Sequence, residues 1–158
     1  MILVDTNVIS ETLRQQPDPA VVRWMDTQSI ETLYLSAVTV AELRYGIAVL
    51  PEGRKRQVLH SGLEQSVLPL FEGRILPFDG ATAESYAELM AAARRRGRVR
   101  GLAAPWAAAR PRGRGVSAAD GYIAATAHAA GLMVATRDTS PFEAVGLAVV
   151  NPWLFDAG

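Results

Sequence analysis

The chain opens on the stretch MILVDTN, residues 1–7, in which a short apolar run ends in three polar side chains. Met1–Val4 has the pattern of a buried strand, and Asp5, Thr6 and Asn7 are all good N-cap residues for a following helix. Short apolar runs followed by helical patterns recur along the chain. This alternation predicts an α/β protein with a largely parallel sheet.

The remaining elements are expected from the same two patterns, apolar β-rich runs and apolar residues at helical spacing. Four more strands are predicted at 33–36, 75–78, 132–135 and 147–150, and six helices at 8–15, 20–28, 37–50, 54–71, 81–96 and 117–130. Pro77 lies within the third strand, which indicates an edge position or a bulge because proline cannot donate to a sheet ladder.

Composition limits the class of protein. The chain has 158 residues, 49% hydrophobic and 20% charged, a balance typical of one globular domain spanning 1–158. Its net charge of zero excludes a globally basic coat for nucleic acid, and the absence of cysteine excludes disulfides, cysteine-based metal sites and a thiol nucleophile. Neither a signal peptide nor a membrane-spanning run is visible, so we expect a cytoplasmic protein without a membrane partner.

An Arg/Gly/Pro-rich segment at about 97–115 departs from this composition. Eight arginines lie between Arg94 and Arg114, with no acid from Leu89 to Ala119, and the glycines and prolines disfavour a helix. We interpret the segment as an inserted loop. Two roles stay open: a surface insertion without function, or an RNA contact that uses backbone-binding arginines and a base-stacking tryptophan. The residues concerned are Arg98, Arg100, Trp106, Arg112 and Arg114.

Four acids are distinguished by their positions. Asp5 and Asp138 follow predicted strands, Asp120 lies in the first turn of a helix, and Glu42 lies about one turn into another. Ligands of open α/β sheets bind outside the carboxyl ends of the strands, so these acids are expected to converge. Oxygen ligands without histidine or cysteine suit Mg²⁺, with Mn²⁺ also plausible.

Each acid also has a purely structural interpretation. Asp5 caps a helix, Asp120 completes a capping box with Ser117, and Asp138 forms an Asx turn before Pro141. Glu42 pairs in this interpretation with an arginine such as Arg44 or Arg23.

Six segments, in this order and over nearly the whole chain, carry a family resemblance. They are ILVDTNVISE, LYLSAVTVAELRYGI, RILPFD, SAADGYIAATAHAAGL, VATRDTSPFEAVGL and VVNPW. In these the chain resembles PIN-domain ribonucleases, and more narrowly the VapC-like or FitB-like toxins of bacterial type II toxin–antitoxin systems. The resemblance implies a three-layer α/β/α fold with a five-stranded, mainly parallel sheet. It also implies a homodimer, and a cognate antitoxin that blocks the active site.

The resemblance further implies a Mg²⁺-dependent endoribonuclease with Asp5, Glu42, Asp120 and Asp138 as its catalytic acids. Our hypothesis is that the three aspartates hold the metal ion, while Glu42 assists or orients the attacking water. Two polar residues, Asn7 and Thr136, match supporting positions of the family.

Two other functions match parts of the sequence. The first is a PIN-like module that binds RNA or an antitoxin with weak or no catalysis, because the insertion ends close to Asp120. The second is a dinucleotide-binding oxidoreductase, suggested by G-x-G-x-x-A at 113–118. That motif requires a strand directly before its glycines, and the preceding residues are arginine, proline and alanine, so it is disfavoured.

Overall fold

The computed structural model describes residues 1–95 and 117–156. They contain a five-stranded sheet with the order β3-β2-β1-β4-β5, and every neighbouring pair is parallel. The strands are β1 (Ile2–Val4), β2 (Leu33–Ser36), β3 (Ile75–Leu76), β4 (Met133–Ala135) and β5 (Val149–Val150). In the centre, Leu3 of β1 aligns with Tyr34 of β2 on one side and with Val134 of β4 on the other. The predicted parallel α/β architecture is confirmed.

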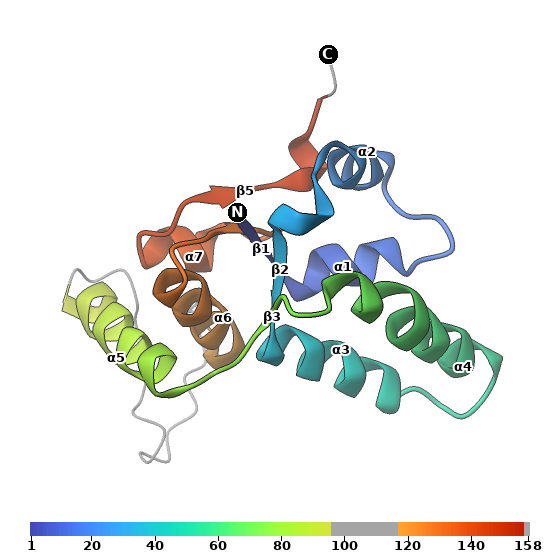
Figure 1. Cartoon of the computed structure of the whole chain (residues 1–158), viewed down its shortest axis with the longest axis horizontal. Coiled ribbons are helices and arrows are strands. Elements are labelled where there is room, and N and C mark those ends of the chain that lie inside the picture. Colours follow the sequence, from blue (N-terminus) through green and yellow to red (C-terminus); the bar gives the residue numbers. More distant parts are fainter. Residues whose placement is uncertain (96–116, 157–158) are drawn as a thin grey trace.

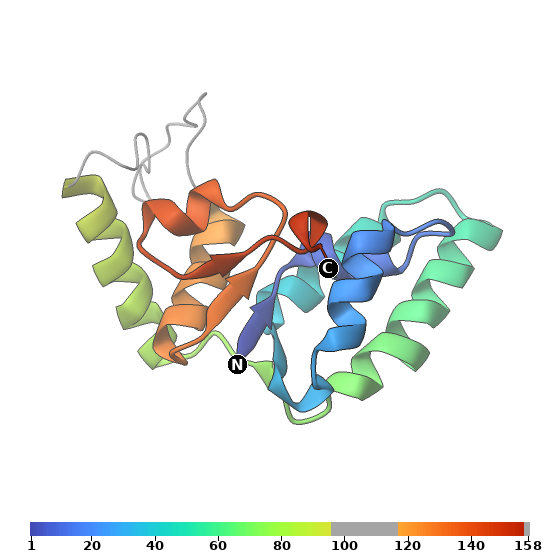
Figure 2. The same ribbon diagram turned by 90° about the horizontal axis from the view of Figure 1, so that it is seen from above.

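Helices cover both faces of this sheet (Figures 1 and 2). One group comprises α1 (Thr6–Thr12), α2 (Pro19–Thr27), α3 (Ala37–Ala48) and α4 (Arg54–Ser61), and the other comprises α5 (Gly80–Arg95), α6 (Ala118–Ala129) and α7 (Ser140–Ala144). Short helical turns complete the described chain: η1 (Ile30–Thr32), η2 (Gly62–Val67), η3 (Leu68–Phe71) and η4 (Pro152–Leu154). Within residues 1–95 and 117–156, no helix has the length and apolar character needed to cross a membrane.

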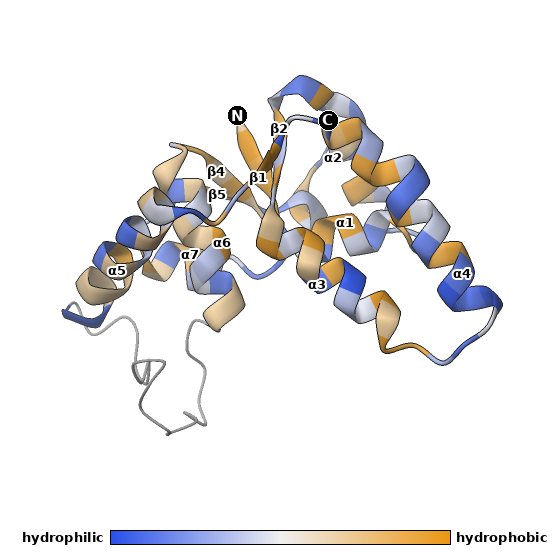
Figure 3. Ribbon diagram, turned by 60° about the horizontal axis from the view of Figure 1, so that its bottom comes forward, coloured by the Kyte–Doolittle hydropathy of each residue, from blue (hydrophilic) through white to orange (hydrophobic). Residues whose placement is uncertain are grey.

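The alternation of side chains along the strands divides the core in two. Val4 and Ala135 pack with α1, α2 and α3 on one face, while Leu3 and Val134 pack with α5, α6 and α7 on the other. Successive strand residues point to opposite faces, so an apolar run of three or four residues supplies both cores. Figure 3 shows the hydrophobic strands β1 and β2 between helices of mixed hydropathy. The result is the predicted three-layer α/β/α arrangement.

The helix expected at 8–15 is α1, and the strand expected at 147–150 is only β5, while α7 was not predicted. Two further elements differ in form. The helix expected over 54–71 is helical throughout but changes form, from α4 to the wider π-turn of η2 and then to the 3₁₀ turn of η3. Pro69 lies at the start of η3, where it has no N–H to continue an α-helical ladder. The strand expected over 75–78 ends at Leu76, directly before Pro77, and lies at the predicted edge.

Candidate active site

The site forms where the central strands end. Asp5 follows β1 directly, and its N–H donates to the carbonyl of Ala135, the last residue of β4, at 3.0 Å. Thr136 continues β4, and its N–H donates to Val150 of β5 at 3.0 Å. Parallel pairing therefore brings residues 5 and 136, far apart in sequence, to one edge of the sheet.

Asp5 is the centre of the polar network and is only 5% exposed. One carboxylate oxygen, Oδ1, accepts from the Thr6 N–H at 2.7 Å, as expected for the N-cap of α1. The other, Oδ2, accepts from Asn7 Nδ2 and from Thr136 Oγ1, both at 2.7 Å. Thr136 is fully buried, so these donors hold the carboxylate in one orientation. Asn7 and Thr136 both bond Asp5, and their supporting role in catalysis stays a prediction.

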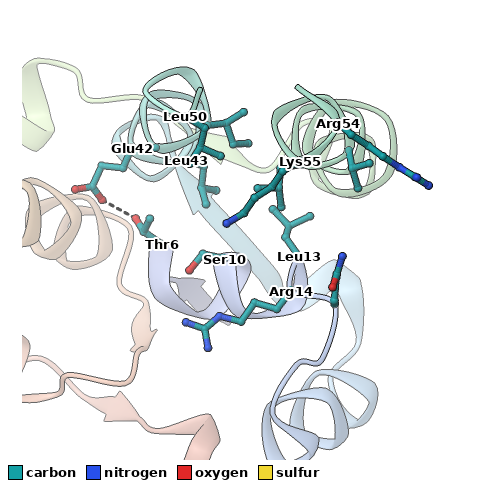
Figure 4. A pocket seen from close by; sticks show the side chains of 14 residues that line it. Thr6, Ser10, Leu13, Arg14, Glu42, Leu43, Leu50, Arg54 and Lys55 are labelled. Carbon is teal, nitrogen blue, oxygen red and sulfur yellow. Dashed lines mark hydrogen bonds between the residues drawn. The ribbon is translucent and has the colours of Figure 1, made fainter. Parts of the chain in front are cut away.

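Glu42 reaches the same network through Thr6, for which the sequence indicates only a capping role. Thr6 Oγ1 donates to Glu42 Oε2 at 2.6 Å, and the two side chains point toward each other from α1 and α3 (Figure 4). The alternative that Arg44 pairs with Glu42 is wrong, because Arg44 binds Glu64 through two hydrogen bonds of 2.7 and 2.9 Å. The sequence gives only a weak signal for the hydrogen bond between Thr6 and Glu42. Thr6 directly follows Asp5, but this position does not show which residue its hydroxyl bonds.

Asp120 and Asp138 both carry the local roles that their sequence context predicts. Ser117 and Asp120 form a capping box: Asp120 N–H donates to Ser117 Oγ at 3.0 Å, and Ser117 N–H donates to Asp120 Oδ2 at 3.2 Å. Asp138 Oδ1 accepts from the N–H and the hydroxyl of Ser140, at 3.3 and 2.8 Å. Among the described residues, these bonds leave the second oxygen of each carboxylate without a donor.

Electrostatics connect Asp5 to the other acids. Burial is the main cause that raises the pKa of Asp5, from 3.8 to about 6, and the charges of Asp120 and Glu42 raise it further. The hydrogen bonds from Thr136 and Thr6 act in the opposite direction. A buried carboxylate beside two other acids is costly in its ionised form unless a cation offsets the charge.

The acidic side chains of the site fit a hard divalent cation. They offer only carboxylate oxygens as metal ligands, which is the ligand type of Mg²⁺ and Mn²⁺. In the ranges 1–95 and 117–156, no three acidic or histidine side chains are gathered closely enough to form a metal site by themselves. Mg²⁺ commonly keeps several waters and uses only one or two carboxylates, so Asp5 with one neighbouring acid and water meets its requirement. Joint ligation by Asp5, Asp120 and Asp138 stays a prediction.

A groove of about 860 Å³ opens beside Thr6 and Glu42, between α1, α3 and α4. Its lining includes the apolar Leu43 and the basic Arg54 and Lys55 (Figure 4). The whole 97–115 segment lies outside the described residues, and with it the predicted RNA contacts Arg98, Arg100, Trp106, Arg112 and Arg114.

Comparison with known proteins identifies the family. The model of the PIN domain matches residues 2–147, most of the chain. This chain belongs to the PIN domain family. The resemblance found in the sequence is therefore confirmed.

Two relatives match this PIN domain over nearly its full length. The protein named VapC ribonuclease Y4jK, from Sinorhizobium fredii, is 55% identical over 153 residues, which cover 97% of this chain and 98% of the relative. Toxin FitB from Neisseria gonorrhoeae is 53% identical over 153 residues, which cover 97% of this chain and 99% of the toxin.

Solved structures agree with the fold. The crystal structure of FitAcB from Neisseria gonorrhoeae contains a chain that superposes with a TM-score of 0.83 at 52% identity, covering 98% of this chain and all of that one. VapBC2 from Rickettsia felis, solved bound to a promoter DNA fragment, gives a TM-score of 0.64 at 22% identity over 96% of this chain and 98% of that one. The second likeness shows the shared fold alone.

Proposed function

We propose that this PIN domain is a metal-dependent endoribonuclease and the toxin of a toxin–antitoxin pair. The observation that carries the proposal is the buried Asp5 carboxylate, whose pKa is raised by burial and by the charges of Asp120 and Glu42. Acids are kept together at such an electrostatic cost where a cation is to be bound. The relative named a VapC ribonuclease, 55% identical over nearly the whole chain, supports RNA as the substrate class.

In this proposal Asp5, Asp120 and Asp138 hold Mg²⁺ or Mn²⁺. When bound there, the cation would activate water for attack and offset the charge that develops on the phosphate. Asn7 and Thr136 fix the orientation of Asp5 through the two hydrogen bonds to Oδ2. The fourth acid, Glu42, is anchored by Thr6 and either assists in holding the ion or orients the attacking water.

Two protein partners follow from the same family relationship. The FitB relative is solved within the assemblies FitAcB and FitAB, which supports a cognate antitoxin for this chain. The groove beside Glu42 offers an apolar lining and basic Arg54 and Lys55 to an antitoxin segment with apolar and acidic side chains. A second copy of the chain is the other proposed partner, and the exposed Tyr45 of α3 and Val49, directly after that helix, support such self-association. Sedimentation of the purified protein tests the dimer through its mass in solution.

The decisive experiment compares metal-dependent cleavage between variants. Purified protein is incubated with mixed structured RNAs in Mg²⁺ or Mn²⁺, beside an EDTA control. We expect cleavage by the wild type and its loss in Asp5→Asn. Asp18→Asn is the matched control, because Asp18 caps α2 in the same way but lies outside the acid network.

Each result has a definite meaning. Cleavage by folded Asp5→Asn protein would contradict the assignment of the acid site. If the wild type neither cleaves RNA nor binds Mn²⁺ in calorimetry, catalysis is rejected and the alternative, a PIN-like binding module, takes its place.

A further inference from the structure

Arg137 lies within the site yet has no assigned role. It stands between Thr136, which donates to Asp5, and Asp138. Its N–H donates to Asn7 Oδ1 at 3.2 Å, and its carbonyl accepts from Asn151 Nδ2 at 3.2 Å. The backbone of Arg137 is thereby fixed relative to the buried carboxylate.

The side chain of Arg137 is oriented by an aromatic ring. Its guanidinium carbon lies 5.3 Å from the ring centroid of Trp153, in the turn η4 that follows β5. Trp153 packs against the core beneath it, so it offers a fixed surface. A cation–π contact uses the face of the ring and consumes none of the five guanidinium N–H donors.

The donors of this guanidinium are available. Arg137 is exposed, and none of the ion pairs or side-chain hydrogen bonds between described residues involves its guanidinium. Two other arginines differ in this respect, because Arg14 pairs with Glu11 and Arg44 pairs with Glu64. Because its backbone is bonded to Asn7, a partner of Asp5, Arg137 brings a cation to a site whose acids would otherwise repel an anionic ligand.

We propose that Arg137 binds a backbone phosphate of the RNA, next to the one that is cleaved, and that Trp153 orients it for this contact. The inference rests on the proposed ribonuclease function. The carboxylates of the site repel RNA phosphates, and a cation at their edge offsets that repulsion. Guanidinium also presents two parallel N–H donors to phosphate, which lysine does not.

The test measures RNA affinity against salt in a protein that does not cleave. In the Asp5→Asn background, binding of a short fluorescein-labelled, mixed-sequence single-stranded RNA is followed by fluorescence anisotropy between about 50 and 200 mM salt. We expect Arg137→Gln to weaken binding by about three- to tenfold and to reduce the slope of log affinity against log salt by about 0.7, the loss of one phosphate contact.

Three further variants separate charge, orientation and background effects. Arg137→Lys keeps the charge, so it should keep the salt slope while losing part of the affinity. Trp153→Leu leaves the charge of Arg137 but removes the ring that orients it. This variant should also keep the salt slope while losing part of the affinity. Arg23→Gln removes an exposed arginine of α2 and should change neither quantity.

Failure of the inference differs from failure of the proposed function. One outcome is that RNA binds while Arg137→Gln changes neither the affinity nor the salt slope and only lowers the melting temperature. In that case Arg137 stabilises the fold without contacting RNA, and the inference is overturned. If Arg137→Gln does not fold, Arg137→Lys decides the matter, and an affinity equal to that of the Asp5→Asn protein alone would overturn the inference. If the Asp5→Asn protein binds no RNA and the wild type cleaves none, the ribonuclease proposal itself is overturned, and the inference with it.

Discussion

Asp5 is a buried carboxylate that is held by three hydrogen-bond donors, yet its pKa remains raised to about 6. The donors therefore orient the group without fully offsetting the cost of burying its charge. Removal of one donor should affect both the stability of the fold and the ionisation of this acid.

Thr136→Val tests this donor at the residue scale. Valine has nearly the shape of threonine but leaves Asp5 Oδ2 with only Asn7 as a donor, so we expect a loss of about 1–3 kcal/mol in the free energy of unfolding. Cleavage should also require higher pH, because the Thr136 hydrogen bond lowers the pKa of Asp5. Thr136→Ser keeps the hydroxyl and is the control. Equal urea midpoints for the two variants would contradict this role of Thr136.

Thr6→Val tests the link between Asp5 and Glu42. The substitution removes the 2.6 Å hydrogen bond to Glu42, while the backbone N–H of residue 6 still donates to Asp5 Oδ1. We expect stability to change little and kcat to fall by about ten- to hundredfold, because Glu42 is no longer positioned. Thr12→Val removes a hydroxyl of the same helix that bonds only the Ile9 carbonyl, and should leave kcat unchanged. A similar fall in both variants would assign the effect to the helix rather than to Glu42.

At the scale of elements, the five strands and most of the helices are predictable because each depends on a local signal, whereas the five-residue helix α7 was not predicted. The apolar run before Asp5 predicts β1, and the pattern Ser117–Asp120 predicts the start of α6. The link from Thr6 to Glu42 was not predictable, because it depends on how α1 lies against α3. The stacking of Arg137 on Trp153 likewise depends on the neighbouring ends of β4 and β5.

The packing of α5 against α6 is a further feature that the sequence does not reveal. A Cβ on Gly121 of α6 would lie 2.9 Å from Cε2 of Tyr86, a ring whose centroid is 5.0 Å from that of Tyr122. Gly121 therefore allows the two helices to approach closely, directly beside Asp120.

Gly121→Ala and Gly46→Ala form a matched pair at this scale. Both place alanine within a helix, which by helix propensity alone should raise the free energy of unfolding by about 0.5–1 kcal/mol. Gly46 of α3 has no heavy atom within 4 Å of the added Cβ, so this gain should appear there. Gly121→Ala should instead destabilise by about 1–3 kcal/mol and impair cleavage, since α6 carries Asp120. Urea unfolding of both variants measures the difference, and equal stabilisation would disprove the close packing.

At the scale of the whole molecule, the acid site opposes the stability of the fold that contains it. The carboxylate of Asp5 is ionised in the unfolded chain above its ordinary pKa of 3.8, whereas in the folded chain the pKa is about 6. A raised pKa of an acid means that the folded state binds the proton more tightly. The stabilisation from Asp5 is thus fully present below pH 3.8 and is lost as pH rises through about 6.

The corresponding measurement is the free energy of unfolding in EDTA as a function of pH, for the wild type and for Asp5→Asn. The wild type should lose up to about 3 kcal/mol relative to the variant between pH 4 and 7, since one pKa unit corresponds to about 1.4 kcal/mol. Other carboxylates titrate in both proteins and cancel in the difference. A difference that does not change with pH would show that Asp5 has an ordinary pKa.

A divalent cation should reverse this loss, because it competes with the proton for the same carboxylate. We therefore expect Mn²⁺ to raise the melting temperature at about pH 7.5 and to have little effect at about pH 5, where Asp5 is largely protonated. At a Mn²⁺ concentration about a hundredfold above its Kd, the stabilisation corresponds to about 2.7 kcal/mol. Asp5→Asn should show little of this stabilisation at either pH, whereas Asp18→Asn should behave as the wild type. Mn²⁺ stabilisation that is equal at both pH values, or that persists in Asp5→Asn, would place the cation elsewhere on the molecule.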